Sequence, residues 1–172
     1  MDRIKNVIRS IPDFPIEGIL FYDITPVLQD PVVFKQTIDF FCNRYRDQKI
    51  TKIAAMESRG FFFAAPLCYA LGCGLVPMRK PGKLPFTTID YSYSLEYGEA
   101  SLEMHTDAIE KGERVLIIDD LLATGGTANA AVELVHKAGG EIVEVAFLIE
   151  LTSLEGRKKI GDVPIFSLLE FE

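Results

Sequence analysis

Apolar and polar residues alternate along this chain in blocks that predict strands and helices in turn. Short, almost continuous apolar runs bounded by polar or glycine residues are typical of buried strands. Apolar residues three and four positions apart instead predict amphipathic helices. The runs fall at residues 50–56, 74–78, 115–119, 142–151 and 163–168, and the helical patterns at 31–48, 61–71 and 128–138. We therefore predict an α/β fold, with a twisted, mainly parallel sheet covered by helices on both faces.

Residues 1–28 have a different pattern, which predicts a small N-terminal hood. Apolar residues at helical spacing in 3–11 predict a short amphipathic helix, and two prolines end it. Residues 14–26 are too irregular for a central strand and too apolar for a free tail. Two interpretations are open for this strip: a flap packed on the core, or a lid whose backbone reads the edge of a flat ligand. Asp30 before Pro31 then has the N-cap pattern of the next helix.

A third pattern, in the middle of the chain, predicts a β-hairpin. Residues 86–96 carry tyrosines among small polar residues, and 101–105 alternates polar and apolar side chains. We interpret residues 84–106 as a β-hairpin that forms a long mobile flap, with SLEYGE at its tip. Since the chain shows no internal repeat or linker, residues 1–172 are predicted to form a single domain.

Composition and charge narrow the class of protein. Of 172 residues, 48% are apolar and 25% are charged, as in ordinary globular proteins. No apolar run approaches the roughly 20 residues that span a membrane, and the N-terminus lacks the apolar core of a signal peptide. The cysteines lack metal-ligand spacing and predict buried, reduced thiols, so a cytoplasmic location is expected. The net charge of −7 argues against nucleic-acid or membrane partners, so cations for an anionic substrate must be gathered locally.

The candidate chemistry centres on residues 115–127, VLIIDDLLATGGT. A buried strand leads into the carboxylates Asp119 and Asp120, and then into a glycine- and hydroxyl-rich loop before a helix. Glycines let the backbone approach a ligand, and the unpaired N–H groups of a helix start attract an anion, most naturally a phosphate. The carboxylates suit the hydroxyls of a ribose or a divalent cation. The loop is neither a Walker A loop nor a GxGxxG loop, and a phosphorylated ribose would fill it.

Two further loops follow predicted strands and carry cations. One is 57–60, Glu-Ser-Arg-Gly, which opens a helix, and the other is 79–83, Arg-Lys-Pro-Gly-Lys. Ligands of open α/β sheets bind beyond the carboxyl ends of the strands, so we expect all three loops to face one cleft. A ligand with a phosphate, a ribose and a further anionic group suits this cleft, as 5-phosphoribosyl 1-pyrophosphate does.

The same segments carry a family resemblance. VLIIDDLLATGGT resembles the phosphoribosyl pyrophosphate signature of the type I phosphoribosyltransferases. FPIEGILFYDITPVL, ESRGF, RKPGKLP, SYSLEYG and ELTSLEGR resemble, in order and over nearly the whole chain, the adenine-specific branch of that family. The resemblance implies a purine salvage enzyme, a Mg²⁺-dependent homodimer that converts adenine and phosphoribosyl pyrophosphate to AMP and pyrophosphate.

The resemblance also implies a role for each loop. It places the 5′-phosphate on Ala123, Thr124, Gly125, Gly126 and Thr127, and the ribose hydroxyls on Asp119 and Asp120. It places pyrophosphate on Ser58, Arg59, Gly60, Arg79, Lys80 and Lys83, with Arg59 also a catalytic candidate. The peptide bond between Glu57 and Ser58 is expected to be cis, and Arg79 to act in its own site or across a dimer interface. Mg²⁺ is expected to be held mainly by substrate and water, with no direct protein ligand.

For the base, the resemblance points to the hairpin tip and the hood. It implies that Glu96 is the catalytic carboxylate, hydrogen-bonded at adenine N7, with Tyr97 beside the base. Leu20, Phe21 and Tyr22 would read the N1 and N6 edge of adenine through their backbone, and Phe21 would stack on the ring. Many family members carry arginine where Tyr22 stands, so backbone readout is expected there rather than a side-chain contact.

Two alternatives stay open from the sequence. A phosphoribosyltransferase for a 6-oxopurine or a pyrimidine would need a different donor set, such as a lysine toward position 6, and residues 14–26 contain none. A non-catalytic, ligand-sensing regulator on the same fold would keep residues 123–127 without needing Glu96 or the cationic loops. The presence of all these features favours the enzyme, and the acidic charge argues against DNA as a partner.

Overall fold

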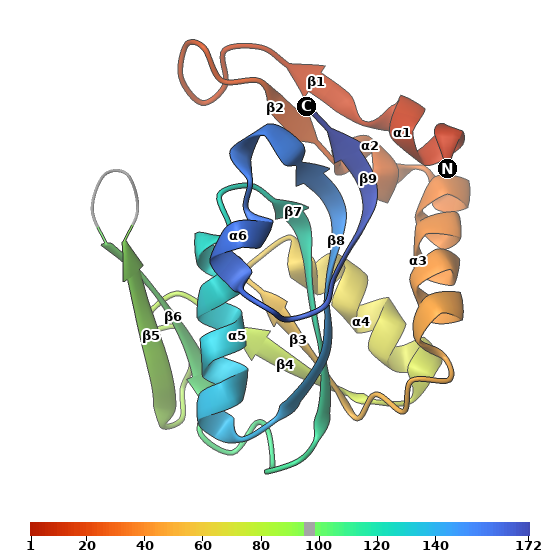
Figure 1. The fold of residues 1–172 in the computed structure, drawn as a ribbon. Helices are drawn as coiled ribbons and strands as arrows, with labels where there is room; N and C mark the ends of the chain where they lie inside the picture. The colour runs from red at the N-terminus through yellow and green to blue at the C-terminus, as the bar shows by residue number, and fades with distance from the viewer. Residues whose placement is uncertain (95–98) are drawn as a thin grey trace. The chain divides into compact units, whose positions relative to one another are not determined.

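The computed structural model describes residues 1–94 and 99–172 (Figure 1). Contacts group the chain into two compact units, Met1–Arg44 and Tyr45–Glu172. The larger unit contains one five-stranded parallel sheet. Its strands are β3 (Lys52–Met56), β4 (Gly74–Met78), β7 (Arg114–Leu122), β8 (Glu141–Leu151) and β9 (Ile165–Phe171). Their spatial order is β4-β3-β7-β8-β9, so the neighbours β3 and β7 are not consecutive in the sequence.

The direction in which the strands are added reverses between β3 and β7. The chain leaves β3 through α4 (Gly60–Leu71) to β4 on one side, and leaves β7 through α5 (Gly126–Ala138) to β8 on the other. Because such crossovers are right-handed, α4 and α5 must cover opposite faces of the sheet, as Figure 1 shows. A 3₁₀ turn (Thr152–Leu154) and a short helix, α6 (Arg157–Ile160), connect β8 to β9. The predicted fold class is therefore confirmed.

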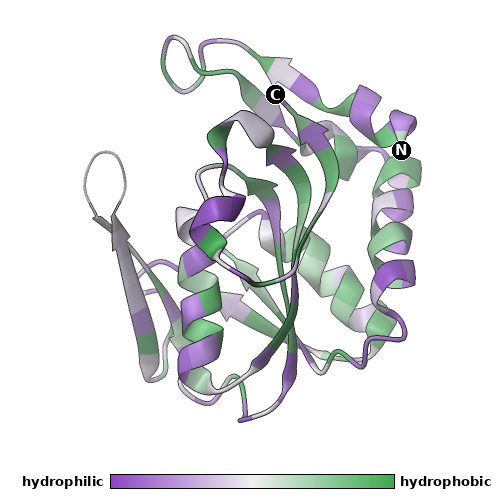
Figure 2. Ribbon diagram, in the orientation of Figure 1, coloured by the Kyte–Doolittle hydropathy of each residue, from purple (hydrophilic) through white to green (hydrophobic). Residues whose placement is uncertain are grey.

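Aliphatic side chains of β7 and α5 form much of the core of the larger unit. Residues 115–118 of β7 are completely buried, and α5 buries Ala131, Leu134 and Val135 on one side. Figure 2 shows the same division, with hydrophobic central strands and hydrophilic residues on the other side of α5. Each of the buried Val, Leu and Ile side chains contributes about 1.5–3 kcal/mol on burial. The ends of these strands are therefore firm supports for the loops that follow them.

The predicted hairpin is present and belongs to the larger unit. Its strands are β5 (Thr88–Ser94) and β6 (Glu99–His105), which pair antiparallel. At the end of β4 the backbone N–H of Arg79 donates to the carbonyl of Glu103 at 2.9 Å, and that of Glu103 donates back at 2.7 Å. Leu102 and Met104 are buried in the core. The strands are held by this packing, and the flap motion expected for residues 84–106 stays a prediction.

The smaller unit corrects part of the N-terminal prediction. It contains α1 (Asp2–Val7), β1 (Arg9–Ile11), β2 (Phe21–Asp23), α2 (Thr25–Gln29) and most of α3 (Pro31–Tyr45). The helix predicted over 3–11 ends at Val7, because residues 9–11 instead pair antiparallel with 21–23. The N-cap prediction is confirmed, since the Asp30 carboxylate accepts the N–H groups of Val32 at 2.8 Å and Val33 at 3.1 Å.

A second correction concerns the strand that leads to the glycine-rich loop. The prediction ended it at residue 119, but β7 continues to Leu122. Its extension is supported by β8, where Leu121 lies opposite Ile149 and Leu122 opposite Glu150. Asp119 and Asp120 are therefore neighbours within a strand, and their side chains point to opposite faces of the sheet.

The cysteine prediction agrees with the structure. The three cysteines carry reduced thiols, and Cys42 and Cys68 are buried as predicted, whereas Cys73 is half-buried. Within residues 1–94 and 99–172, no helix has the length and apolar character needed to cross a membrane. The cytoplasmic location stays a prediction.

Candidate active site

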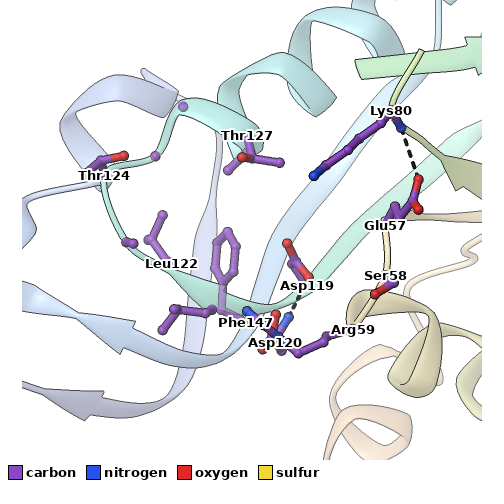
Figure 3. Close-up of a pocket in the computed structure, with 15 residues that line it drawn as sticks. Glu57, Ser58, Arg59, Lys80, Asp119, Asp120, Leu122, Thr124, Thr127 and Phe147 are labelled. Atoms are coloured by element: carbon purple, nitrogen blue, oxygen red, sulfur yellow. Dashed lines mark hydrogen bonds and ion pairs between the residues drawn. The ribbon is translucent and has the colours of Figure 1, made fainter. Parts of the chain in front are cut away.

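A cavity of about 380 Å³ lies at the carboxyl ends of β3 and β7, where the strand order reverses. This is the place where open α/β sheets bind their ligands. Figure 3 shows its lining, which comes from three loops that are distant in sequence. The lining residues are Glu57, Ser58, Arg59, Lys80, Asp119, Asp120, Leu121, Leu122, Ala123, Thr124, Gly125, Gly126, Thr127, Ala128 and Phe147.

The glycine-rich loop supplies one end of the cavity. The loop leaves β7 after Leu122, and α5 begins at Gly126. Gly125 has φ +81°, a backbone conformation that residues with a side chain rarely adopt. Because α5 begins here, its first N–H groups have no partner within the helix and attract an anion. Thr124 and Thr127 add hydroxyl groups to the lining, so this end of the cavity suits a phosphate.

Gly156 supports this loop from outside the cavity, a role that the sequence analysis did not assign. Its φ of −56° is ordinary, so its backbone does not require glycine. Space does, because a Cβ at residue 156 would lie 2.2 Å from the carbonyl oxygen of Ala123 and 3.1 Å from the amide nitrogen of Gly125. The loop and Gly156 therefore touch backbone to backbone. The ELTSLEGR segment contains this glycine, but its contact with residues 123–125 cannot be read from the segment itself.

An ion pair anchors Gly156 through the next residue. Arg157 donates from Nε to Glu150 at 2.7 Å and from Nη2 to the same carboxylate at 2.5 Å. Ser167 donates to Glu150 at 2.6 Å, which joins β9 to the pair. The Arg157 hydrogen bond holds the pKa of Glu150 below its usual value, and Glu150 raises that of Arg157. This bidentate pair, buried on the Glu150 side and partly exposed at Arg157, thus anchors the segment that contacts the glycine-rich loop.

A second unpredicted contact comes from the hairpin. The hydroxyl of Tyr93 on β5 lies 3.0 Å from Oγ1 of Thr127, in the first turn of α5. The Tyr93 ring lies against Gly126, where a Cβ would be 3.1 Å from ring atom Cδ2. The sequence indicated a hairpin rich in tyrosine but held no information about which helix it would meet.

The two carboxylates of β7 lie in different surroundings. Asp120 is almost fully buried, and its Oδ2 accepts a hydrogen bond from Nε of Arg59 at 2.5 Å. Asp119 accepts the backbone N–H of Asp120 at 2.8 Å. Desolvation, followed by the charge of Asp120, raises the pKa of Asp119 well above its usual range. The oxygens of both carboxyl groups can accept hydrogen bonds, which suits the hydroxyls of a sugar.

The cationic loops converge on one carboxylate, Glu57. Nζ of Lys83 donates to it at 2.7 Å, both Nε and Nη2 of Arg79 donate at 3.3 Å, and the backbone N–H of Lys80 donates at 3.1 Å. These bonds, led by that of Lys83, lower the pKa of Glu57 to about 2. The side chain of Lys80 instead points into the cavity (Figure 3). Together with Arg59, it is the cation that faces the space between the loops.

Most of the predicted phosphate, ribose and pyrophosphate residues meet in this cavity. Ser58, Arg59, Lys80, Asp119, Asp120 and all five residues 123–127 line it. Gly60 does not, but it starts α4 so close to β7 that a Cβ would lie 2.9 Å from the Ile118 carbonyl oxygen. Arg79 and Lys83 also lie outside the lining and bind Glu57. The peptide bond between Glu57 and Ser58 is cis, as the resemblance implied.

The residues predicted to contact adenine are not tested by this cavity. Leu20, Phe21 and Tyr22 belong to the smaller unit, where Phe21 and Phe14 pack edge to face at 5.1 Å between ring centroids. Glu96 and Tyr97 lie outside the described residues. Their assignments stay predictions.

The chain matches a known protein family. Residues 25–171 match the family described as phosphoribosyl transferase domain. The match covers most of the chain and defines the class of protein as the phosphoribosyltransferases.

Relatives that match the chain over nearly its full length identify a narrower family within this class of protein. An adenine phosphoribosyltransferase of Desulfosudis oleivorans is 56% identical over 169 residues, 98% of each chain. The crystal structure of the Thermoanaerobacter pseudethanolicus adenine phosphoribosyltransferase has 54% identity, covers 99% of each chain and superposes with a TM-score of 0.96. The Saccharomyces cerevisiae adenine phosphoribosyltransferase, solved with an imino-altritol bisphosphate and adenine, has 42% identity over 98% of this chain and 97% of that one, with a TM-score of 0.93. The chain therefore belongs to the adenine phosphoribosyltransferase family.

Proposed function

We propose that this protein transfers the 5-phosphoribosyl group of phosphoribosyl pyrophosphate to adenine, forming AMP and pyrophosphate. The observation that carries the proposal is one cavity lined by the glycine-rich loop 123–127, the carboxylates of Asp119 and Asp120, and the cations of Arg59 and Lys80. Its relatives in bacteria and yeast bear the name of this activity, and the yeast structure was solved with adenine and a bisphosphate. A transferase for another nucleobase and a non-catalytic regulator are the alternatives that this proposal replaces.

The 5′-phosphate would bind at residues 123–127. Backbone N–H groups at the start of α5 and the hydroxyls of Thr124 and Thr127 would donate to its oxygens. The ribose would lie over β7, where Asp119 and Asp120 accept from its hydroxyls. Since both ends of the sugar are held, the reacting carbon C1′ is directed away from the loop, toward Arg59 and Lys80.

Pyrophosphate would bind at the opposite end, on Ser58, Arg59 and Lys80. Arg59 and Lys80 face the cavity and would stabilise the charge that grows on pyrophosphate as it leaves. Arg79 and Lys83 bind Glu57 and would add positive charge near the pyrophosphate. Pyrophosphate could also compete with the Glu57 carboxylate, and these two side chains would then turn toward the ligand. Gly60 gives α4 the close approach to β7 that this arrangement needs.

The donor set fits Mg²⁺ held by substrate rather than by a protein cage. Within the described ranges, no three His, Cys, Asp or Glu side chains gather into a metal site. Asp119 and Asp120 are the carboxylates next to the ribose position and would hold the ion through its water molecules. When bound, the ion would offset the negative charge of pyrophosphate.

The base would be held by the hood and the hairpin tip. Leu20, Phe21 and Tyr22 would supply backbone donors and acceptors and a ring for stacking, and Tyr97 would lie beside the base. Adenine N9 attacks C1′, the bond from C1′ to the pyrophosphate oxygen breaks, and the electron pair leaves with pyrophosphate. The Glu96 carboxylate would take the proton that the imidazole ring of adenine must lose. Closure over the site would exclude water, which would otherwise hydrolyse the activated ribose.

The test is product formation by the purified protein. With phosphoribosyl pyrophosphate and Mg²⁺, we expect AMP from adenine and little or no nucleotide from hypoxanthine, guanine or uracil in parallel reactions. Preference for another base would support the first alternative. No nucleotide from any base, with phosphoribosyl pyrophosphate still bound, would support the regulator. Sedimentation of the same sample tests the homodimer that the resemblance implies.

A further inference from the structure

Tyr93 touches the phosphate loop without lining the cavity. Its hydroxyl lies 3.0 Å from Oγ1 of Thr127, while Thr127 itself lines the cavity. Tyr93 is half-buried, and it packs against the core of the larger unit. The hydrogen bond is therefore partly screened from water and joins a strand of the hairpin to the first turn of α5.

The packing around this bond holds the tyrosine in place. Gly126 leaves room for the ring, since a Cβ at that position would lie 3.1 and 3.4 Å from ring atoms Cδ2 and Cε2. Further along β5, Nζ of Lys137 lies 5.2 Å from the Tyr91 ring centroid and donates to the Asp90 carbonyl at 2.8 Å. Strand β5 is thus attached to α5 near the helix start and again near its end.

We propose that Tyr93 is a positioning residue for the 5′-phosphate site, acting through Thr127. A threonine hydroxyl carries one proton and can both donate and accept. When Tyr93 donates to Oγ1, the Thr127 proton is free to point to the other side, into the cavity. An anion there accepts this proton, so the order of donors runs from Tyr93 to Thr127 to a phosphate oxygen. The inference rests on the proposed function, because it assumes that the phosphate binds at residues 123–127.

The role of Tyr93 is indirect. Tyr93 contacts no reacting atom, so its substitution affects binding of the phosphoribosyl group before it affects the chemical step.

Calorimetric titration with ribose 5-phosphate and, separately, with pyrophosphate tests the proposal. Tyr93→Phe keeps the ring and removes the hydroxyl. We expect it to weaken ribose 5-phosphate binding about threefold to tenfold, as for one hydrogen bond, and to leave pyrophosphate binding within about twofold. Tyr91→Phe is the matched control on the same face of the hairpin and should bind both ligands as the wild type does.

A double-mutant cycle separates positioning from packing. In a Thr127→Ala background, Tyr93→Phe should have no further effect, because the hydroxyl through which it acts is gone. In a Thr127→Ser background, which keeps a hydroxyl, the effect should return. Equal losses in all three backgrounds, or unchanged binding in Tyr93→Phe, would overturn the proposal. These outcomes leave AMP formation by the wild type untouched, so they are distinct from a failure of the proposed function.

Discussion

The two ends of the cavity differ in the groups that line them. The proposed 5′-phosphate end is mostly backbone, at residues 123–127, which Gly156 and Tyr93 contact. The proposed pyrophosphate end has charged side chains that already bind carboxylates of the same protein. Asp120 binds Arg59 there, and Glu57 binds Arg79 and Lys83 just outside the lining.

The two ends therefore differ in what determines their affinity for a ligand. A backbone site is preorganised, so its affinity depends on shape and is lost when the loop is displaced. At the charged end, a ligand must replace carboxylates that are already paired with the cations. Its affinity therefore depends on the strength of those ion pairs, on the salt concentration and on the pH. Lys80 is the exception there, since its side chain already points into the cavity.

The largest expected effect falls on neither end but on the chemical step. Glu96→Ala should lower kcat by ~10²–10⁴-fold, the usual span for general acid–base catalysis, with little change in the KM for phosphoribosyl pyrophosphate. Glu96→Gln should be similarly slow, because an amide cannot take the proton. Steady-state kinetics with adenine decide this, and a near wild-type kcat in either variant would remove Glu96 from its role.

Gly156→Ala should weaken ligand binding at the proposed phosphate end and leave the charged end unchanged. The added Cβ would lie 2.2 Å from the Ala123 carbonyl oxygen, so the loop must shift, and overpacking of this kind costs about 1–3 kcal/mol. We expect ribose 5-phosphate binding to weaken about tenfold or more, and pyrophosphate binding to stay near that of the wild type.

A matched glycine lies at the other end of the sheet. The three atoms nearest to a Cβ on Gly74 all belong to the flexible Lys52 side chain, at 3.1 Å or more, so Gly74→Ala should bind both ligands normally. If the two alanine variants behave alike, contact with Gly156 does not shape the phosphate loop.

Arg59→Ala should weaken ligand binding at the charged end and also lower the stability of the fold. It leaves the Asp120 side chain, 5% exposed, without its 2.5 Å ion pair. Loss of a partner for a buried polar group costs about 1–3 kcal/mol, and chemical denaturation measures it. Pyrophosphate binding should fall as well.

The double variant Arg59→Ala with Asp120→Asn separates the two effects. It should recover stability, because the buried charge is gone, but not pyrophosphate binding. Recovery of both would mean that Arg59 acts only as a structural partner of Asp120.

The smallest effect concerns Glu57 and depends on pH. Its folded pKa of about 2 lies below its ordinary value of 4.5, so the ionised form is stabilised. This contribution is present above about pH 4.5 and is lost as the pH falls toward 2. Glu57→Gln should therefore lower the free energy of unfolding by about 1 kcal/mol or less at pH 6, since the cations are partly exposed. The difference between the two proteins in the free energy of unfolding should narrow as the pH falls from 4.5 toward 2, and a constant difference would contradict this assignment.

Much of the fold could be predicted because its signals are local. The apolar runs at 74–78 and 142–151 match β4 and β8 almost residue for residue, and the Asp30 cap is predicted by two adjacent residues, Asp30 and Pro31. The errors arose where pairing is distant. Residues 9–11 became a strand through 21–23, and β7 gained Leu121 and Leu122 through β8.

The candidate site divides in the same way. Residues 123–127 and the acidic pair could be found from sequence because the chemistry lies in one stretch. Gly156 and Tyr93 could not, because each matters only through a loop that is far away in the chain. The contact between Glu57 and Arg79 does have a signal in the sequence, because each residue directly follows a predicted strand. Met56 pairs with Met78 in the parallel sheet, which places the next residues, Glu57 and Arg79, side by side.

The central claim is that one cavity holds the two ends of phosphoribosyl pyrophosphate at separate places. The most direct measurement is calorimetric titration of Mg²⁺-pyrophosphate into wild-type protein saturated with ribose 5-phosphate. We predict that pyrophosphate still binds, with one molecule of each ligand per chain and an affinity within about tenfold of that of the free protein. Displacement of ribose 5-phosphate by pyrophosphate would contradict the claim, because it would mean that both ligands use the same place.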